Sequence, residues 1–124
     1  MATTLDAEDV RLLAEIGFIA LLSGFMREAE LIFSGIQAAR PEGETGPLGL
    51  ALLRMATNEL DEAISILRSQ RRSVAAQAYL GLALARQGDR VRARKTLQGV
   101  VDRAPDTPFA ALAKAGLREL LGIS

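Results

Sequence analysis

Apolar residues recur along most of the chain at the three- and four-residue spacing that is typical of amphipathic helices. Leucine, alanine, arginine and glutamate, which favour helices, dominate the sequence, and β-branched residues never alternate with polar ones for long. The apolar stretch 17–33, GFIALLSGFMREAELIF, contains Gly17 and Gly24, although a glycine inside a helix costs about 0.5 to 1 kcal/mol relative to alanine. The pattern therefore predicts an all-α fold in which these glycines serve a structural purpose.

An internal repeat explains where the glycines fall. Residues 13–41 align without a gap with residues 77–105, and a weaker copy occupies residues 47–70. The spacing between equivalent alanines is 34 residues from the first unit to the second but only 30 from the second to the third, so we expect the second helix of the middle unit to be trimmed by about one turn. The equivalent pairs in the outer units are Gly17 and Gly81, Gly24 and Gly88, Ala29 and Ala93, Phe33 and Leu97, and Pro41 and Pro105.

The glycines of the repeat have two expected roles. Gly17 and Gly81 are expected where a second helix passes close by, because any side chain there would hold the two helices apart. Gly24 and Gly88 are expected to end helices in the left-handed conformation, and Asn58 takes that place in the middle unit. Small residues expected at the same close helix contacts are Ala29, Ala51, Ala63 and Ala93.

Helix-end signals frame the array. Thr4 or Asp6 is expected to cap the first helix, and residues 40–47, RPEGETGP, are the clearest loop. Asp106 or Thr107 is expected to cap a last helix that closes the array. In this helix Pro108 takes the first position, and the apolar side consists of Phe109, Leu112, Ala113, Leu117, Leu120 and Leu121. Apolar residues of the first helix that we expect to face its partner are Leu12, Leu13, Ile16, Ile19 and Ala20.

The repeat pattern resembles the tetratricopeptide repeat, a helix-turn-helix unit of about 34 residues. Departures are the missing leading tryptophan, Arg54 in place of an apolar residue, and the missing terminal proline of the middle unit. The resemblance implies an all-α domain of about seven helices, wound into a right-handed superhelix. Its parts would be a first repeat at about 10–43, a shortened second at about 44–73, a third at about 74–107 and a capping helix at about 107–122.

Composition excludes most catalytic chemistry. The 124 residues, which suit one domain, include no cysteine and no histidine, so the chain lacks a thiol nucleophile, a zinc-type ligand set and the usual general base. Tyr79, Lys95 and the scattered carboxylates form no convergent set. We therefore expect no enzyme, no catalytic residue, no metal and no cofactor.

The charges are unevenly divided. Residues 1–62 hold 11 acidic residues and 4 arginines, whereas residues 63–124 hold 4 acidic and 11 basic residues. The simplest interpretation of this uneven charge is a solvated helix surface that steers association with a partner without specifying it. The basic segment 86–95, RQGDRVRARK, lacks interleaved aromatic residues, so no nucleic-acid partner is expected. Contact between the acidic half of one copy and the basic half of another would instead give a homo-oligomer.

The start of the chain argues against export and membrane insertion. Asp6, Glu8 and Asp9 stand where a secretory signal would need positive charge, and the apolar run 16–25 is shorter than a bilayer requires. We therefore expect a soluble, cytoplasmic protein with no membrane partner.

Helical phase selects a binding surface on the concave side of the predicted array. Arrays that grip the carboxylate end of chaperone tails use lysine, arginine and asparagine here, whereas this set is apolar apart from one arginine, which favours an amphipathic helix as the occupant. The alternative is that these residues bury against one another. The ten groove positions are Ala14, Phe18, Leu21, Leu22, Leu48, Leu52, Met55, Ala78, Leu82 and Arg86, and Ala56 and Ala85 share their phase.

A closer resemblance concerns function. Segments 15–42, EIGFIALLSGFMREAELIFSGIQAARPE, and 78–89, AYLGLALARQGD, are similar to small tetratricopeptide-like proteins of bacterial type III secretion systems, in particular the needle-subunit chaperones. The resemblance implies a chaperone that holds a C-terminal helix of a small self-assembling subunit, often with a second small chaperone. The implied groove is Phe18, Leu21, Leu22, Leu48, Leu52, Met55 and Leu82. A self-associating structural component of the secretion apparatus is the alternative.

Overall fold

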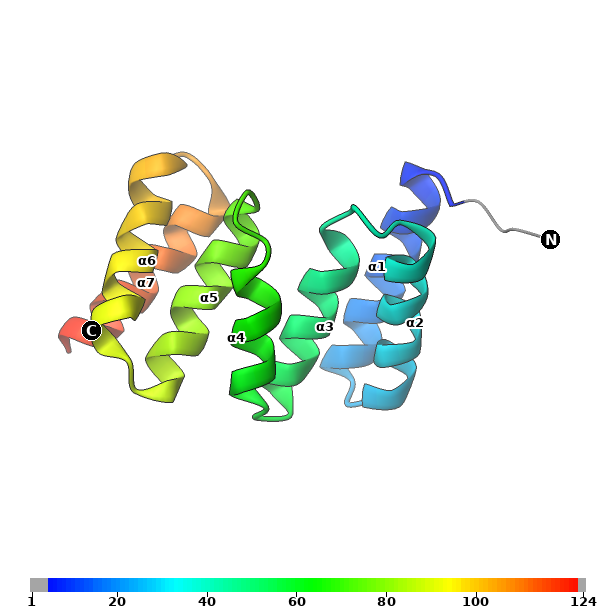
Figure 1. The fold of residues 1–124 in the computed structure, drawn as a ribbon, viewed down its shortest axis with the longest axis horizontal. Helices are drawn as coiled ribbons and strands as arrows, with labels where there is room; N and C mark the ends of the chain where they lie inside the picture. Colours follow the sequence, from blue (N-terminus) through cyan, green and yellow to red (C-terminus); the bar gives the residue numbers. More distant parts are fainter. Residues whose placement is uncertain (1–4, 123–124) are drawn as a thin grey trace.

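The computed structural model describes residues 5–122, which form seven α-helices and no strand (Figure 1). The helices stand side by side along the long axis, with α1 and α2 at one end of the molecule and α6 and α7 at the other. The prediction of an all-α fold with about seven helices is confirmed; the hand of the superhelix and the exact repeat boundaries stay predictions. The helices are α1 (Ala7–Leu22), α2 (Met26–Ala39), α3 (Thr45–Ala56), α4 (Leu60–Arg68), α5 (Val74–Gln87), α6 (Arg90–Arg103) and α7 (Pro108–Leu121).

Contacts between helices define the shape of the array. Successive helices pack as pairs, α1 with α2, α3 with α4 and α5 with α6, and α7 packs on both α5 and α6. The first helices of the pairs also contact one another in the order α1, α3, α5 and α7, whereas within residues 5–122 the second helices α2, α4 and α6 do not. The array therefore curves toward its first helices, and these form the concave face.

Local sequence sets the helix ends as expected. The Asp6 carboxylate accepts a hydrogen bond of 2.9 Å from the Asp9 amide, and the Asp6 amide donates one of 3.1 Å to the Asp9 carboxylate, so the two residues form a capping box before α1. Thr107 caps α7 through its hydroxyl, and Pro108 takes the first helical position. Both caps are confirmed, while Thr4 lies outside the described residues.

Three helix turns depend on the left-handed conformation. Gly24 and Gly88 have φ angles of +85° and +96°, and Asn58 has +62°. Each lies between the two helices of a pair, which confirms the roles predicted from the repeat.

Glycines also set the distance between helices. A Cβ atom on Gly17 of α1 would lie 2.7 Å from Cζ of Phe33, and one on Gly81 of α5 would lie 2.5 Å from Cγ of Leu97. Phe33 and Leu97 are fully buried on α2 and α6. The predicted close contacts are therefore confirmed, with one large side chain filling each space.

Two further glycines, on the helices that follow, contact the same large side chains, Phe33 and Leu97, from the opposite side. A Cβ atom on Gly49 of α3 would overlap the ring of Phe33, and one on Gly116 of α7 would lie 3.0 Å from Cδ1 of Leu97. The large residue on each outer second helix is thus enclosed by glycines from the first helices of its own pair and of the next. This arrangement lets a phenylalanine and a leucine be buried without separating three adjacent helices.

The middle pair carries the shortened helix. Helix α4 has 9 residues, whereas α2 and α6 each have 14, which confirms the trimmed second helix. Its apolar face, formed by Ala63, Ile64 and Leu67, is nonetheless buried.

The loop before α3 is shorter than the expected 40–47. Helix α3 begins at Thr45, so that Gly46 and Pro47 lie in its first turn and are buried. A proline is tolerated there because the first amides of a helix have no intrahelical partner. A Cβ atom on Gly46 would lie 2.9 Å from Cα of Gln37 in α2, so the glycine permits close packing rather than a turn.

The core divides into two clusters that meet at α3. The first consists of buried residues from α1 and α2 together with Leu53, and the second runs from Ala51 and Met55 through α4, α5, α6 and α7. Neighbouring residues of α3 therefore belong to different clusters, and α3 is the joint between an N-terminal and a C-terminal lobe.

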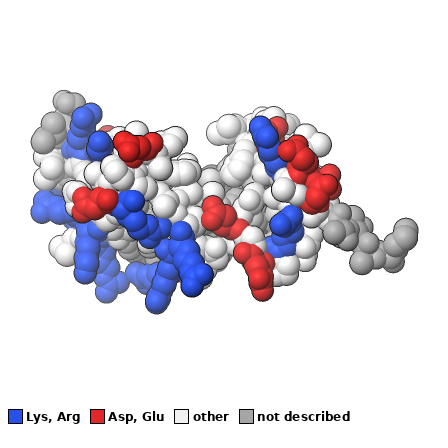
Figure 2. Space-filling view, turned by 90° about the horizontal axis from the view of Figure 1, so that it is seen from above, with Lys and Arg blue, Asp and Glu red and all other residues white. Residues whose placement is uncertain are grey.

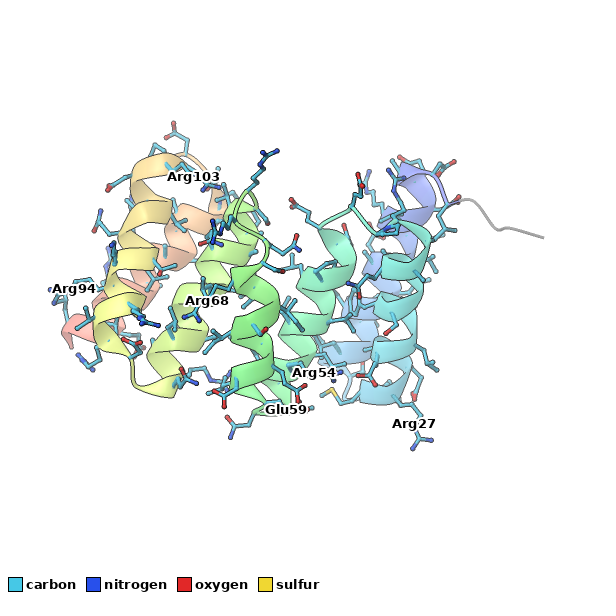
Figure 3. All side chains as sticks on the ribbon, viewed as in Figure 1. Arg27, Arg54, Glu59, Arg68, Arg94 and Arg103 are labelled. Carbon is cyan, nitrogen blue, oxygen red and sulfur yellow. The ribbon has the colours of Figure 1, made fainter. Side chains whose placement is uncertain are left out.

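Arg54 lies at this joint, where the repeat pattern would have an apolar residue. Its guanidinium is hydrogen-bonded to Glu30 of α2 and lies 3.1 Å from Glu62 of α4, so one side chain of α3 links helices on both sides (Figure 3). The hydrogen bond to Glu30 raises the pKa of Arg54, against the opposing effect of burial. The arginine therefore remains charged and completes an ion network that replaces the apolar contact.

Candidate functional site

The ten groove positions all lie on the concave helices α1, α3 and α5. Their accessibility differs, and three classes are apparent. Half-buried are Phe18, Leu21, Leu48, Leu52 and Leu82, which offer apolar surface. Leu22, 87% exposed, and Arg86 are exposed. Ala14, Met55 and Ala78 are buried and belong to the core, so their side chains offer little or no surface to a partner.

A cleft of 510 Å³ opens between α1 and α3 and brings three groove positions together: Ala14, Phe18 and Leu48. The ring of Phe18 lies 4.8 Å from that of Phe33, tilted by 56°, so the apolar wall of the cleft is continuous with the core of the first lobe. Charged residues at the cleft are Arg11, Glu15, Arg40 and Glu44.

Val10 and Thr45 also line this cleft and are not among the ten predicted positions. Val10 lies one turn before Ala14, and Thr45 lies three residues before Leu48, so the helical spacing that selected the ten positions could have found both.

The remaining positions follow the groove toward the other end of the array. Leu52 of α3 and Leu82 of α5 pack partly against the second core cluster. A Cβ atom on Gly116 of α7 would lie 2.9 Å from Cδ2 of Leu82, so α7 borders the groove at that end. The groove therefore runs from the α1–α3 cleft, across α3, to α5 and α7.

A second apolar surface lies on the outer side of α1. Leu12, Ile16 and Ile19 are 58%, 45% and 64% exposed. The prediction that they face α2 is wrong, because Ala14, Gly17 and Ala20 form the buried side of this helix. The three exposed residues follow one another at spacings of four and three, so they form one continuous apolar line, which we call the α1 stripe. No helix of the described chain covers it, since α1 is the first.

The two halves of the chain carry opposite charge. Residues 5–62 contain 11 acidic and 4 basic residues, and residues 63–122 contain 4 acidic and 11 basic residues. In Figure 2 the basic side chains gather over the C-terminal half of the molecule, and acidic ones predominate on the other half. Arg68, Arg94 and Arg103, labelled in Figure 3, come from α4 and α6 in the basic half.

Other kinds of site find little support. Residues 5–122 include no group of three or more acidic side chains placed to hold a metal ion. Within the same range, no helix has the length and apolar character needed to cross a membrane.

Comparisons with known proteins identify the fold. Residues 75–107, which include most of α5 and all of α6, match the tetratricopeptide repeat model. No curated protein sequence matches the chain. Among solved structures, the first tetratricopeptide domain of Spaghetti (RPAP3), bound to the HSP90 peptide SRMEEVD, superposes with a TM-score of 0.76 at 19% identity, covering 98% of this chain and 97% of that one.

Two further solved structures are also similar. The Yersinia enterocolitica type III secretion chaperone SycD, in complex with a peptide of the translocator YopD, has a TM-score of 0.74 at 16% identity, covering 93% of this chain and 94% of that one. The CopN–Scc3 complex has a TM-score of 0.70 at 15% identity, covering 91% and 69%. The chain therefore has the tetratricopeptide-repeat fold that its repeat pattern predicted.

Proposed function

We propose that this chain is a protein-binding module that holds an amphipathic helix of a small, self-assembling secretion subunit in its concave groove, as a cytoplasmic type III secretion chaperone. The observation that carries the proposal is the accessible apolar surface along α1, α3 and α5. Phe18, Leu48 and Leu52 are half-buried in the free chain, so they retain apolar surface that a partner can cover.

The chemistry of the groove fits an apolar occupant. Arg86 is the only charged residue among the ten positions, and at the cleft Arg11 and Arg40 are balanced by Glu15 and Glu44, so an anionic tail would meet no excess of positive charge. An amphipathic helix would present apolar side chains three and four residues apart to the cleft and to Leu52. The apolar face of a subunit that polymerises through it would be masked against Phe18, Leu48 and Leu52, while the charged residues at the cleft, Arg11, Glu15, Arg40 and Glu44, could face the polar side of the helix.

Similar folds support the proposal. The domain of Spaghetti (RPAP3) is bound to an HSP90 peptide, and SycD is bound to a peptide of the translocator YopD. SycD is a type III secretion chaperone, which matches the resemblance seen in the sequence. Enzymatic activity is no part of the proposal.

Co-expression with the needle subunit of its own host tests the function. We expect the wild-type chain to keep the subunit soluble and unpolymerised, and Leu22→Asp to abolish this effect. Leu22 is the better test position because it is 87% exposed, whereas Leu52 packs partly against the core. Leu31→Asp, at a site on α2 that is 69% exposed and outside the groove, is the matched control.

The outcome that contradicts the proposal is equally definite. Polymerisation of the subunit in the presence of the wild-type chain, or equal protection by wild type and Leu22→Asp, would show that the groove does not hold the subunit.

A further inference from the structure

We propose that copies of this chain associate end to end, with the α1 stripe of one copy docked on the outer face of α7 of the next. The two faces are the terminal surfaces of the helical array, and neither contributes a groove position. The apolar residues of this contact are thus separate from the ten groove positions, although Glu15 at its edge also lines the α1–α3 cleft.

The outer surfaces of the two terminal helices, α1 and α7, differ in the polarity of their exposed side chains. Terminal helices of repeat arrays usually expose a polar face, because an apolar one would be left open to water. Helix α7 follows this rule with Lys114 and Arg118, both exposed. Helix α1 breaks it, because Leu12, Ile16 and Ile19 are exposed. Within residues 5–122, α1 therefore exposes a line of three large apolar residues, whereas α7 exposes one, Leu121, in its last turn.

Shape complementarity links the two ends. The α1 stripe offers large side chains at i, i+4 and i+7. The outer face of α7 offers Ala111 and Ala115, both exposed and also four residues apart. Large side chains of one helix can therefore fit the spaces that small ones leave on the other. The same combination of a large residue against glycine or alanine packs the interior of each lobe.

Charge complementarity selects a second copy as the occupant. Glu8 and Glu15 flank the α1 stripe, and Lys114 and Arg118 flank the small residues of α7. If the helices run antiparallel with Leu12 over Ala115, Glu15 comes near Lys114 and Glu8 near Arg118, because each pair lies at a similar level along the helices. The exposed Glu119 is also level with Glu8, but helical phase places it on the other flank of Ala115 from Arg118.

Self-pairing of two α1 helices is disfavoured by the same charges. Helix α1 and its cap carry Asp6, Glu8, Asp9 and Glu15 against Arg11 alone, so a pair of α1 helices would bring like charges together. Glu15 already forms an ion pair of 3.6 Å with Arg11, but both side chains are more than 60% exposed, and such pairs are weak. A head-to-tail contact between α1 and α7 instead joins the acidic half of one copy to the basic half of the next.

Sedimentation of the full chain tests this association. We expect the wild-type mass to rise with concentration above the 13.2 kDa of one chain and, unless a ring closes, beyond that of a dimer. Higher salt should weaken the association by about tenfold, because exposed charges are screened. A wild-type protein that stays monomeric at every concentration overturns the proposal.

Two variants, each blocking one face, identify the contact. Ile16→Glu blocks the α1 stripe, and Ala115→Glu places an acid on the outer face of α7; each variant should sediment as a monomer with unchanged circular dichroism. Their equimolar mixture should form a dimer and stop there, because only one α1 and one α7 face remain intact. Association of Ala115→Glu alone, or a mixture that stays monomeric, contradicts the α1–α7 contact. Binding of the needle subunit in the groove should be unaffected by either variant, so this test and that of the proposed function can fail independently.

Discussion

The ring of Phe33 on α2 occupies the space that Gly49 leaves free on α3, so that a Cβ atom at position 49 would overlap the ring. Phe33 is fully buried, and Gly17 of α1 borders it from the other side. This contact joins the first helix pair to the rest of the array. It makes the stability of the N-terminal lobe depend on two residues that lack a side chain.

Substitution of Gly49 tests this dependence. Gly49→Ala should lower the free energy of unfolding by about 1 to 3 kcal/mol, because an added methyl group forces a packed ring to move. Gly35→Ala is the matched control, since a Cβ at this helical glycine meets no atom within 4 Å, and it should raise stability by up to about 1 kcal/mol. Urea unfolding monitored by circular dichroism measures both. Equal midpoints for the two variants would contradict the packing described.

The left-handed backbone conformation of Asn58 predicts that substitution by glycine and by alanine will affect stability differently. Its φ of +62° is a conformation that glycine adopts freely and alanine does not. Asn58→Gly should therefore leave stability unchanged or raise it by a few tenths of a kcal/mol, whereas Asn58→Ala should lower it by about 1 kcal/mol. The difference between the two urea midpoints is the measurement, and its absence would rule out a strained turn between α3 and α4.

The ion network at the joint of the lobes predicts a salt-dependent effect. Arg54→Ala should lower stability by about 1 kcal/mol at low salt and by less at high salt, because the side chains of Glu30 and Glu62 are 44% and 62% exposed, so that salt screens them. Arg27→Ala, on the exposed surface of α2 and in none of the ion pairs of the described residues, is the control. A loss that does not change with salt would show that Arg54 acts through packing of its aliphatic part instead.

Helix contacts made by residues that recur at the 64-residue spacing could be predicted from the sequence. Contacts made by residues outside that register could not. The role of Gly17 could be predicted because Gly81 stands at the same place 64 residues later. Gly49 has no such support in the sequence, since the residue 64 positions after it is Ala113, and the glycine that makes the equivalent contact with Leu97, Gly116, lies out of that register. A glycine that stands outside the repeat register gives no sign of which helix it touches.

The two apolar faces of α1 could not be distinguished by periodicity either. Leu13 and Ala20 belong to the packed side, and Ile16 and Ile19 to the exposed side, yet all four are apolar. Only the position of α1 at the end of the array decides which side is covered. Ala78 of the groove was misjudged for the opposite reason: α5 has neighbours on both sides, so a small residue there is buried completely.

The central claim, that the concave groove holds an amphipathic helix, is tested most directly by methyl NMR of the chain with its leucine and alanine methyl groups labelled. Addition of the C-terminal segment of the host needle subunit should shift the methyl signals of Leu21, Leu48, Leu52 and Leu82, while Leu31 and Leu121 on other surfaces stay unchanged. Shifts confined to Leu12 on the α1 stripe, or no shifts at all, would contradict the claim.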